Sequence, residues 1–491
     1  MSPSPTRTPA LRRLAVSAVS VVLGLGALTV VGSLSATGSA IPAPTPEASC
    51  GKGARPETDI QGRVPQSDYA SGRAKRGYRC NTKPIARFGS TGGFKVLRYT
   101  DRQGQTCAYY DSTLLFPQNF PFTAEAGLGV VVLDMDNPRR PRQTDQLTTP
   151  AMLTPHESLL LNRKRGMIAA VSGNAATYPG VLDVYDVRSD CRHPKLLSSS
   201  PAAGLGHESG WSHDGLTFYA ASTFGQTLVA VDLTDATKPR PIFTQTGVNF
   251  HGMRLSRDGN VLYAANIGNP DGAITFSTGG LRILDVSEIQ ARKANPGVEV
   301  LADLVWPGHS IAQASEPFVK GKRKYLLETD EFANYRLDGG ADQAEAPVGA
   351  ARIIDVTNPR RPRIVSDLRL QVHQPGARRG DQRNDPGAAS YVQGYAGHYC
   401  SVSRYRNPKL AGCSMIASGL RVFDIRRLRK PVEAAYFNQP DTGSNGEAPS
   451  GAYAMSEPAW DAKRRSVWYT DGNTGFYNVQ LKNGVGKLLK R

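Results

Sequence analysis

The chain has 491 residues and a formal net charge of +17, from 59 Lys and Arg against 42 Asp and Glu. Hydrophobic residues make up 40% and charged residues 21%, which excludes a largely disordered chain. The 50 Gly and 34 Pro indicate many turns, but not a low-complexity sequence. So basic a chain favours acidic partners, whatever its fold.

The first 40 residues have the features of an export signal. Arg7, Arg12 and Arg13 precede an uncharged stretch from Leu14 to about Gly32, and small residues follow up to Ala40. The alternative is an uncleaved anchor, because about 19 apolar and small residues can span a bilayer. We predict cleavage after residue 40, a remaining charge of about +14, no later transmembrane span, and a secreted or cell-surface location.

An exported chain can form disulfides. Cys400 and Cys413 flank a short loop between two strand-like runs, so we predict that they pair. The other four cysteines allow three pairings, which stay open: Cys50, Cys80, Cys107 and Cys191. Residues 41–90 are rich in Pro, Gly and Arg and lack apolar periodicity, which predicts a poorly ordered N-terminal arm.

One strand-like phrase then recurs along the rest of the chain, usually ending in Asp. Its β-branched and aromatic composition is typical of strands. The copies lie at residues 129–134, 181–186, 228–232, 281–285, 351–355, 420–424 and, in degenerate form, 476–480. Several end in a turn phrase with Pro, such as 136–141, so we interpret the repeated Asp as a turn former and not as a catalyst.

The repeat predicts an all-β protein, a seven-bladed β-propeller over residues 91–491. Upstream of most copies lies a strand, a charged turn and another strand, with Asp214-Gly215 and Asp258-Gly259 as hairpin signals. A further short strand follows each Pro turn, which makes four strands per unit. Stacked radially, such units leave only short, protected sheet edges. The last blade lacks a clear fourth strand, which either residues 487–489 or residues near 85–88 would supply.

These phrases, above all Gly419-Leu-Arg-Val-Phe-Asp-Ile425, resemble the LVIVD repeat of secreted bacterial propeller proteins. The resemblance covers roughly residues 94–481 and implies an exported or surface-associated propeller without an assigned reaction. The His-bearing inner strands are more distantly similar to those of selenium-binding-protein and lactonase-like propellers, some of which hold metals. Their metal motifs are not visible in this sequence, so no residue is carried over from them.

Polar residues recur where the innermost strands begin. They are His156, Glu157, His207, Glu208, His251, Glu316, His398 and Glu457. Seven-fold packing would bring such positions to the mouth of the central channel. There they would hold a divalent transition metal such as Zn, Mn or Fe, or act as acid and base. The alternative is structural, because repeated sequence repeats residues without function. Strand alternation also predicts that His156 and Glu157 do not both face the channel.

Basic residues gather in the turns of the opposite, lower face. The candidates for binding a polyanion are Arg139, Arg140, Lys164, Arg323, Arg360, Arg361, Arg426, Arg427 and Arg464. The upper loop 331–348 instead carries mainly acids, beginning with Glu331. Anionic cell-envelope polymers or a protein would be the partners of an exported chain. No aromatic stacking motif accompanies the arginines, so we do not expect nucleic acid. The alternative is that charged turns serve solubility and protect edges.

The leading hypothesis from the sequence is therefore an exported binding or scaffolding module, a monomer without its own reaction. The rival is a metal-dependent hydrolase or oxidoreductase that uses the His/Glu positions. No nucleophile elbow, phosphate-binding loop, dinucleotide motif or HExxH occurs in the sequence. Fold alone does not choose between the two, because propellers host both.

Overall fold

The computed structural model describes residues 41–112, 128–173, 180–204, 206–222, 226–268, 279–306, 311–332, 348–378, 381–388, 394–444 and 449–490. The predicted export signal, residues 1–40, lies outside them. Within these ranges no helix is long and apolar enough to cross a membrane.

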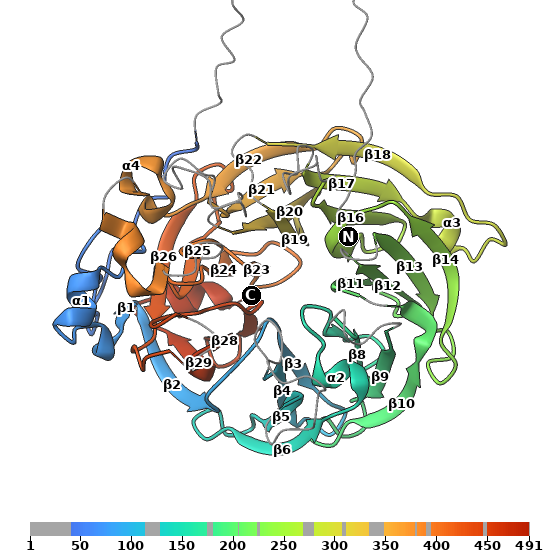
Figure 1. Cartoon of the computed structure of the whole chain (residues 1–491), viewed down its shortest axis with the longest axis horizontal. Coiled ribbons are helices and arrows are strands. Elements are labelled where there is room, and N and C mark those ends of the chain that lie inside the picture. Colours follow the sequence, from blue (N-terminus) through green and yellow to red (C-terminus); the bar gives the residue numbers. More distant parts are fainter. Residues whose placement is uncertain are drawn as a thin grey trace, which may run out of the picture. The chain divides into compact units, whose positions relative to one another are not determined.

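Seven four-stranded antiparallel blades form a ring, which confirms the predicted β-propeller (Figure 1). Blade 1 consists of β3 (Val96–Thr100), β4 (Thr106–Asp111), β5 (Val130–Asp134) and β6 (Arg142–Leu147). Blade 2 consists of β7 (Leu160–Asn162), β8 (Met167–Val171), β9 (Leu182–Asp186) and β10 (Lys195–Ser200). Blade 3 consists of β11 (Glu208–Trp211), β12 (Thr217–Ser222), β13 (Thr227–Asp232) and β14 (Arg240–Thr246).

The next blades follow the same order from the centre to the rim. Blade 4 consists of β15 (Phe250–Leu255), β16 (Val261–Asn266), β17 (Gly280–Asp285) and β18 (Glu299–Leu304). Blade 5 consists of β19 (Ile311–Lys320), β20 (Arg323–Glu331), β21 (Ala351–Asp355) and β22 (Arg363–Leu368). Blade 6 consists of β23 (Tyr399–Val402), β24 (Leu410–Ser414), β25 (Leu420–Asp424) and β26 (Val432–Asn438).

Blade 7 is closed by the N-terminal arm. Its strands β27 (Ala459–Asp461), β28 (Ser466–Asp471) and β29 (Gly475–Leu481) pair with β2 (Thr82–Phe88) as the outermost strand. Strand β1 (Tyr78–Cys80) adds a fifth strand to blade 6. Of the two alternatives for the closing strand, the structure thus uses the residues near 85–88.

The expectation of a poorly ordered arm over residues 41–90 is therefore wrong. The arm also forms helix α1 (Gln66–Ala70) and a disulfide between Cys50 and Cys80. Sequence periodicity missed it because an outermost strand is half-exposed, and β2 has no run of buried apolar residues. The other short helices are α2 (Pro150–Leu153), α3 (Ser287–Gln290) and α4 (Pro375–Arg378).

The recurrent phrase is the third strand of each blade. These strands are buried on both faces between neighbouring blades, so they are almost continuously apolar, as in β5. In six blades the carboxylate of the repeated Asp accepts a hydrogen bond from the N–H two residues later, at 2.8–3.0 Å. The residues are Asp134, Asp186, Asp232, Asp285, Asp355 and Asp424. The interpretation of this Asp as a turn former is confirmed.

Third and fourth strands also share a break of register in every blade. In blade 7 the break lies between Pro84 and Ala86 of β2, so the arm reproduces the geometry of the other outermost strands. Three disulfides are present, and Cys400–Cys413 is the pair expected from the sequence. Cys107–Cys191 links blade 1 to the turn after β9 of blade 2.

Candidate functional site

Four histidines meet at the centre of the ring, where the innermost strands of four blades begin. His156 precedes β7, His207 precedes β11, His251 lies in β15 and His398 precedes β23. The Nε2 atoms of His156 and His207 are 3.3 Å apart, and the rings of His207 and His251 have centroids 4.4 Å apart. The blade repeat therefore brings together imidazoles that are between 44 and 242 residues apart in the sequence.

Glu157 lies among these histidines. Its carboxylate is 3.1 Å from Nε2 of His398, 3.2 Å from Nε2 of His251 and 3.6 Å from Nε2 of His207. The carboxylate of Glu331, at the end of β20, approaches two of these rings and lies 3.5 Å from Nε2 of both His251 and His398. A carboxylate in the middle of several imidazoles provides the mixed nitrogen and oxygen donors that transition metals take.

The expectation that His156 and Glu157 do not both point inward is wrong. Strand alternation does not apply to them, because β7 begins only at Leu160. His156 also has a φ of +48°, which is uncommon for a residue other than Gly. This backbone conformation turns both side chains toward His207, and backbone strain of this kind is often found at functional sites.

Two of the imidazoles are oriented by backbone carbonyls. Nδ1 of His398 lies 2.7 Å from the carbonyl oxygen of Met455, and Nδ1 of His251 lies 3.1 Å from that of Gln313. Because a carbonyl only accepts, each Nδ1 must donate its N–H, and Nε2 is the atom left to bind a proton or a metal ion. Such a hydrogen bond behind the ring is what metal-ligating histidines normally make.

Burial and charge act against each other in this cluster. Burial alone would lower the pKa of His251 and His398, but the neighbouring carboxylates, Glu157 first, raise the pKa of both to about 9. Burial would raise the pKa of Glu157, but the imidazoles around it hold that pKa well below its usual value. Burial, followed by His156, lowers the pKa of His207. The carboxylates therefore retain positive charge at this place, as protons or as a cation.

Three overlapping sets of side chains have ligand atoms within 4.8 Å of one another. All three contain Glu157. The sets are His156, Glu157 and His207; Glu157, Glu331 and His398; and Glu157, Glu208 and His251. The side chain of His207 is 14% exposed, whereas His156 is 5% exposed and the side chains of His251 and His398 at most 3%, so His207 is the most exposed of the four.

A second layer of charge lies beside the cluster. Lys95, fully buried, contacts Glu208 at 2.9 Å and Glu457 at 3.2 Å. Arg254 contacts the same two carboxylates at 3.0 and 2.8 Å and Glu316 at 3.6 Å. Of the predicted site residues, Glu316 and Glu457 thus belong to this layer and touch none of the four histidines.

Glu208 connects the two layers. Its Oε2 lies 3.8 Å from Nδ1 of His251, while its Oε1 meets Lys95 and Arg254. Burial would raise the pKa of Glu208, but the two cations lower it to about 2. Burial and the charge of Glu457 raise the pKa of Glu316 to about 7. The layer thus holds Glu208 ionised behind His251.

Sequence reasoning missed four members of these layers. Gln313 of β19 occupies the position that a histidine has in other blades and donates from Nε2 to Glu157 at 2.8 Å. Glu331 was assigned to an acidic loop, although it ends β20. Lys95 follows Phe94 at the start of blade 1, and Arg254 lies in β15. Alignment of the seven innermost strands identifies Gln313 as the residue at the histidine position of blade 5. No sequence pattern indicates that Lys95 and Arg254 lie beside the cluster.

The nine predicted polyanion-binding residues lie at the face opposite the histidines, eight of them in turns and Arg323 at the first position of β20. Because successive strands alternate in direction, the turns after the first and third strands share that face. Four of the side chains pair with acids: Arg323 with Asp355, Arg360 with Glu299, Arg426 with Asp424 and Arg464 with Asp461. Among the described residues, no ion pair involves the side chains of Arg139, Arg140, Lys164, Arg361 or Arg427.

No protein-family model matches the sequence, and no curated protein matches it. Among solved structures, the chain is similar to hydrazine synthase of Kuenenia stuttgartiensis, with 13% identity over 79% of this chain and 94% of that one (TM-score 0.47). It is also similar to a periplasmic gluconolactonase of Pseudomonas aeruginosa, with 14% identity over 74% of this chain and 91% of that one (TM-score 0.48). These similarities concern the fold and assign no activity to this chain.

Proposed function

We propose that this propeller binds a divalent transition metal ion among its central histidines and works as a metal-dependent hydrolase or oxidoreductase. The observation that carries the proposal is Glu157, whose carboxylate lies within 3.6 Å of Nε2 of three histidines. Imidazole and carboxylate donors suit Zn, Mn or Fe better than Ca, which prefers oxygen ligands only.

Each residue of the histidine cluster would have a role that follows from its position. His251 and His398 present Nε2 because their Nδ1 atoms donate to backbone carbonyls. Glu157 and Glu331 balance the charge of the ion, and His207 lies on the side that solvent reaches. A bound metal ion of this kind polarises a substrate oxygen or activates water. A carboxylate of the cluster that is not occupied by the ion would then take up or release the proton.

Metal analysis of the purified protein tests this proposal. After incubation with Zn, Mn, Fe or Cu salts and desalting, we expect one ion per chain, and we expect His398→Ala and Glu157→Gln to lose it. His193→Ala and Glu316→Gln are matched controls, because His193 is 62% exposed and Glu316 lies outside the histidine cluster. No stoichiometric ion in the wild type, or equal metal content in all four variants, would refute the metal centre.

The export signal and the LVIVD resemblance remain part of the proposal. The three disulfides are consistent with an extracytoplasmic protein, because such bonds persist in oxidising compartments. Binding of an anionic partner without catalysis is the second candidate function. It is favoured by the exposed cations of the lower face that form no ion pair with any described residue.

A further inference from the structure

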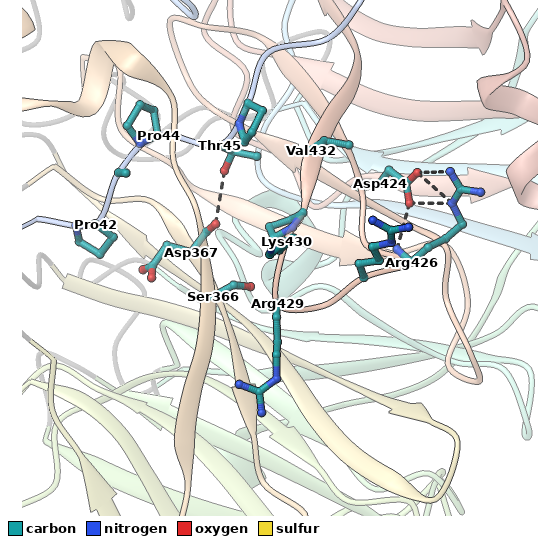
Figure 2. A pocket seen from close by; sticks show the side chains of 14 residues that line it. Pro42, Pro44, Thr45, Ser366, Asp367, Asp424, Arg426, Arg429, Lys430 and Val432 are labelled. Carbon is teal, nitrogen blue, oxygen red and sulfur yellow. Dashed lines mark hydrogen bonds and ion pairs between the residues drawn. The ribbon is translucent and has the colours of Figure 1, made fainter.

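A groove lies at the rim of the lower face, between blades 5 and 6. Its volume is about 710 Å³. One wall is the segment from Pro42 to Pro46, another is β22 at Ser366 and Asp367, and the third is the turn from Asp424 to Val432 (Figure 2). The groove is thus built from three parts of the chain, two of which are more than 300 residues from the first.

The proline-rich wall is held firmly in place. The N–H of Thr45 donates to the carbonyl of Arg369 at 2.8 Å, and the N–H of Arg369 donates to Oγ1 of Thr45 at 3.1 Å. On the other side, the N–H of Glu433 donates to the carbonyl of Pro46 at 2.9 Å. Three prolines in five residues also restrict the backbone of this segment. The wall therefore needs little ordering when a ligand binds beside it.

The turn on the opposite side is strongly basic. It carries Arg426, Arg427, Arg429 and Lys430 against one acid, Asp424. Arg426 pairs with Asp424 at 2.7 Å, whereas Arg429 reaches away from that pair (Figure 2). No ion pair within the described part of the chain neutralises Arg427, Arg429 or Lys430, and all three are exposed. Turns that are charged only for solubility usually mix both signs, which is not the case here.

The positive charge continues along blade 5. Arg361 and Arg363 precede Ser366 on the same edge, both are exposed, and neither has an ion pair among the described residues. Five exposed cations for which the described residues provide no ion pair thus follow this edge of the rim and the groove beside it. Guanidinium groups bind phosphate and carboxylate oxygens through paired hydrogen bonds, and a row of them fits a chain with repeated charges.

We propose that this groove binds the oxyanions of a linear anionic polymer, with phosphate or carboxylate groups seated between the Pro42–Pro46 wall and the Arg427–Lys430 turn. The site rests on the second candidate function, binding by the lower face, and does not depend on the metal centre. The sequence predicted nine basic residues spread over the lower face, whereas this proposal assigns the binding of the polymer to a single groove.

Binding to long-chain polyphosphate and to polygalacturonate, measured by fluorescence anisotropy at several salt concentrations, tests the site. The two probes distinguish phosphate from carboxylate as the preferred group. In Arg429→Glu/Lys430→Glu, we expect at least a tenfold loss of affinity for the preferred probe and a shallower dependence on salt. The control is Lys482→Glu/Lys487→Glu, which makes the same charge change at two exposed lysines that lie outside both the groove and the nine candidate residues, and that have no ion pair among the described residues. It should change affinity less than threefold.

Three results would count against the groove. Equal losses in the two double variants would show a diffuse field in place of a site, while binding by the lower face would stand. No binding of the wild type to either probe would refute both the groove and the second candidate function. Inorganic phosphate that competes at the same phosphate concentration as polyphosphate would show a site for a single anion and refute a polymer. Circular dichroism of each variant confirms that the fold is retained.

Discussion

The strongest prediction concerns the carboxylate at the centre of the histidines. In Glu157→Gln, the shape of the side chain is kept and its negative charge is removed. In the metal-free protein, His251 and His398 hold their protons up to about pH 9, whereas histidines of the unfolded chain lose them near 6.5. The folded state thus binds more protons in this range. The resulting stabilisation is complete below pH 6.5 and is lost as the pH rises through 9.

The size of the effect follows from the shift. Raising a pKa from 6.5 to about 9 corresponds to about 3 kcal/mol for each histidine. The two contributions share Glu157 and Glu331, so they do not add fully. Without the charge of Glu157 we expect the variant to lose about 3 kcal/mol of stability near pH 6 and almost nothing near pH 10.

Urea unfolding of the protein in a chelator, at a series of pH values, measures this difference. Histidine NMR titration should show two pKa values falling toward or below 6.5 in the variant. Glu316→Gln is the matched control: the pKa of Glu316 is already raised to about 7, so an amide differs little from its protonated form near neutral pH. If Glu157→Gln and the wild type show parallel urea midpoints from pH 6 to 10, the assignment of Glu157 as the partner of both histidines is wrong.

Metal binding must displace the protons on the central imidazoles, so the metal affinity should rise between about pH 6.5 and 9, with proton release in calorimetry. Removing the Cys107–Cys191 disulfide, which closes a loop of 84 residues, should lower the free energy of unfolding in urea by about 4–5 kcal/mol. Removing Cys400–Cys413, which closes a loop of 13 residues, should lower it by about 3 kcal/mol. The reverse order would contradict the explanation by chain entropy. Gly252→Ala would place a Cβ onto the Glu208 carboxylate and should lower both thermal stability, by about 1–3 kcal/mol, and metal content. A chain that begins at residue 90 lacks β2 and should aggregate on expression, because the edge of β29 is then open; a soluble propeller would show that closure by the arm is dispensable.

The fold could be predicted from the sequence because its signal repeats. Third strands are largely buried on both faces, so the copies are mainly apolar runs, and six of the seven end in a turn-forming Asp. The N-terminal arm contains no copy of this repeat. Strand β2 is recognised as a fourth strand only by pairing with β29 from the other end of the chain, a contact between residues nearly 400 positions apart.

The candidate site could be predicted only where it follows the repeat. Four histidines occupy related positions in their blades and do come together. Glu331 and Gln313 belong to the cluster through the ends of particular strands, and the pairing of Lys95 with Glu208 joins residues from blades 1 and 3. Residues that pair across the ring axis have no fixed spacing in the sequence, so a sequence pattern does not predict these pairs.

The positions that are not histidine explain why the cluster is polar on one side only. Blades 1 and 7 place Phe94 and Met455 at the centre, within one buried apolar group, and the ring of Phe94 packs 4.6 Å from His156 and 5.3 Å from His398. The nitrogen and oxygen donors therefore face an apolar wall that excludes water. In such a setting the attraction between Glu157 and a cation is stronger than at the surface, and an ion held there is approached from the side of His207.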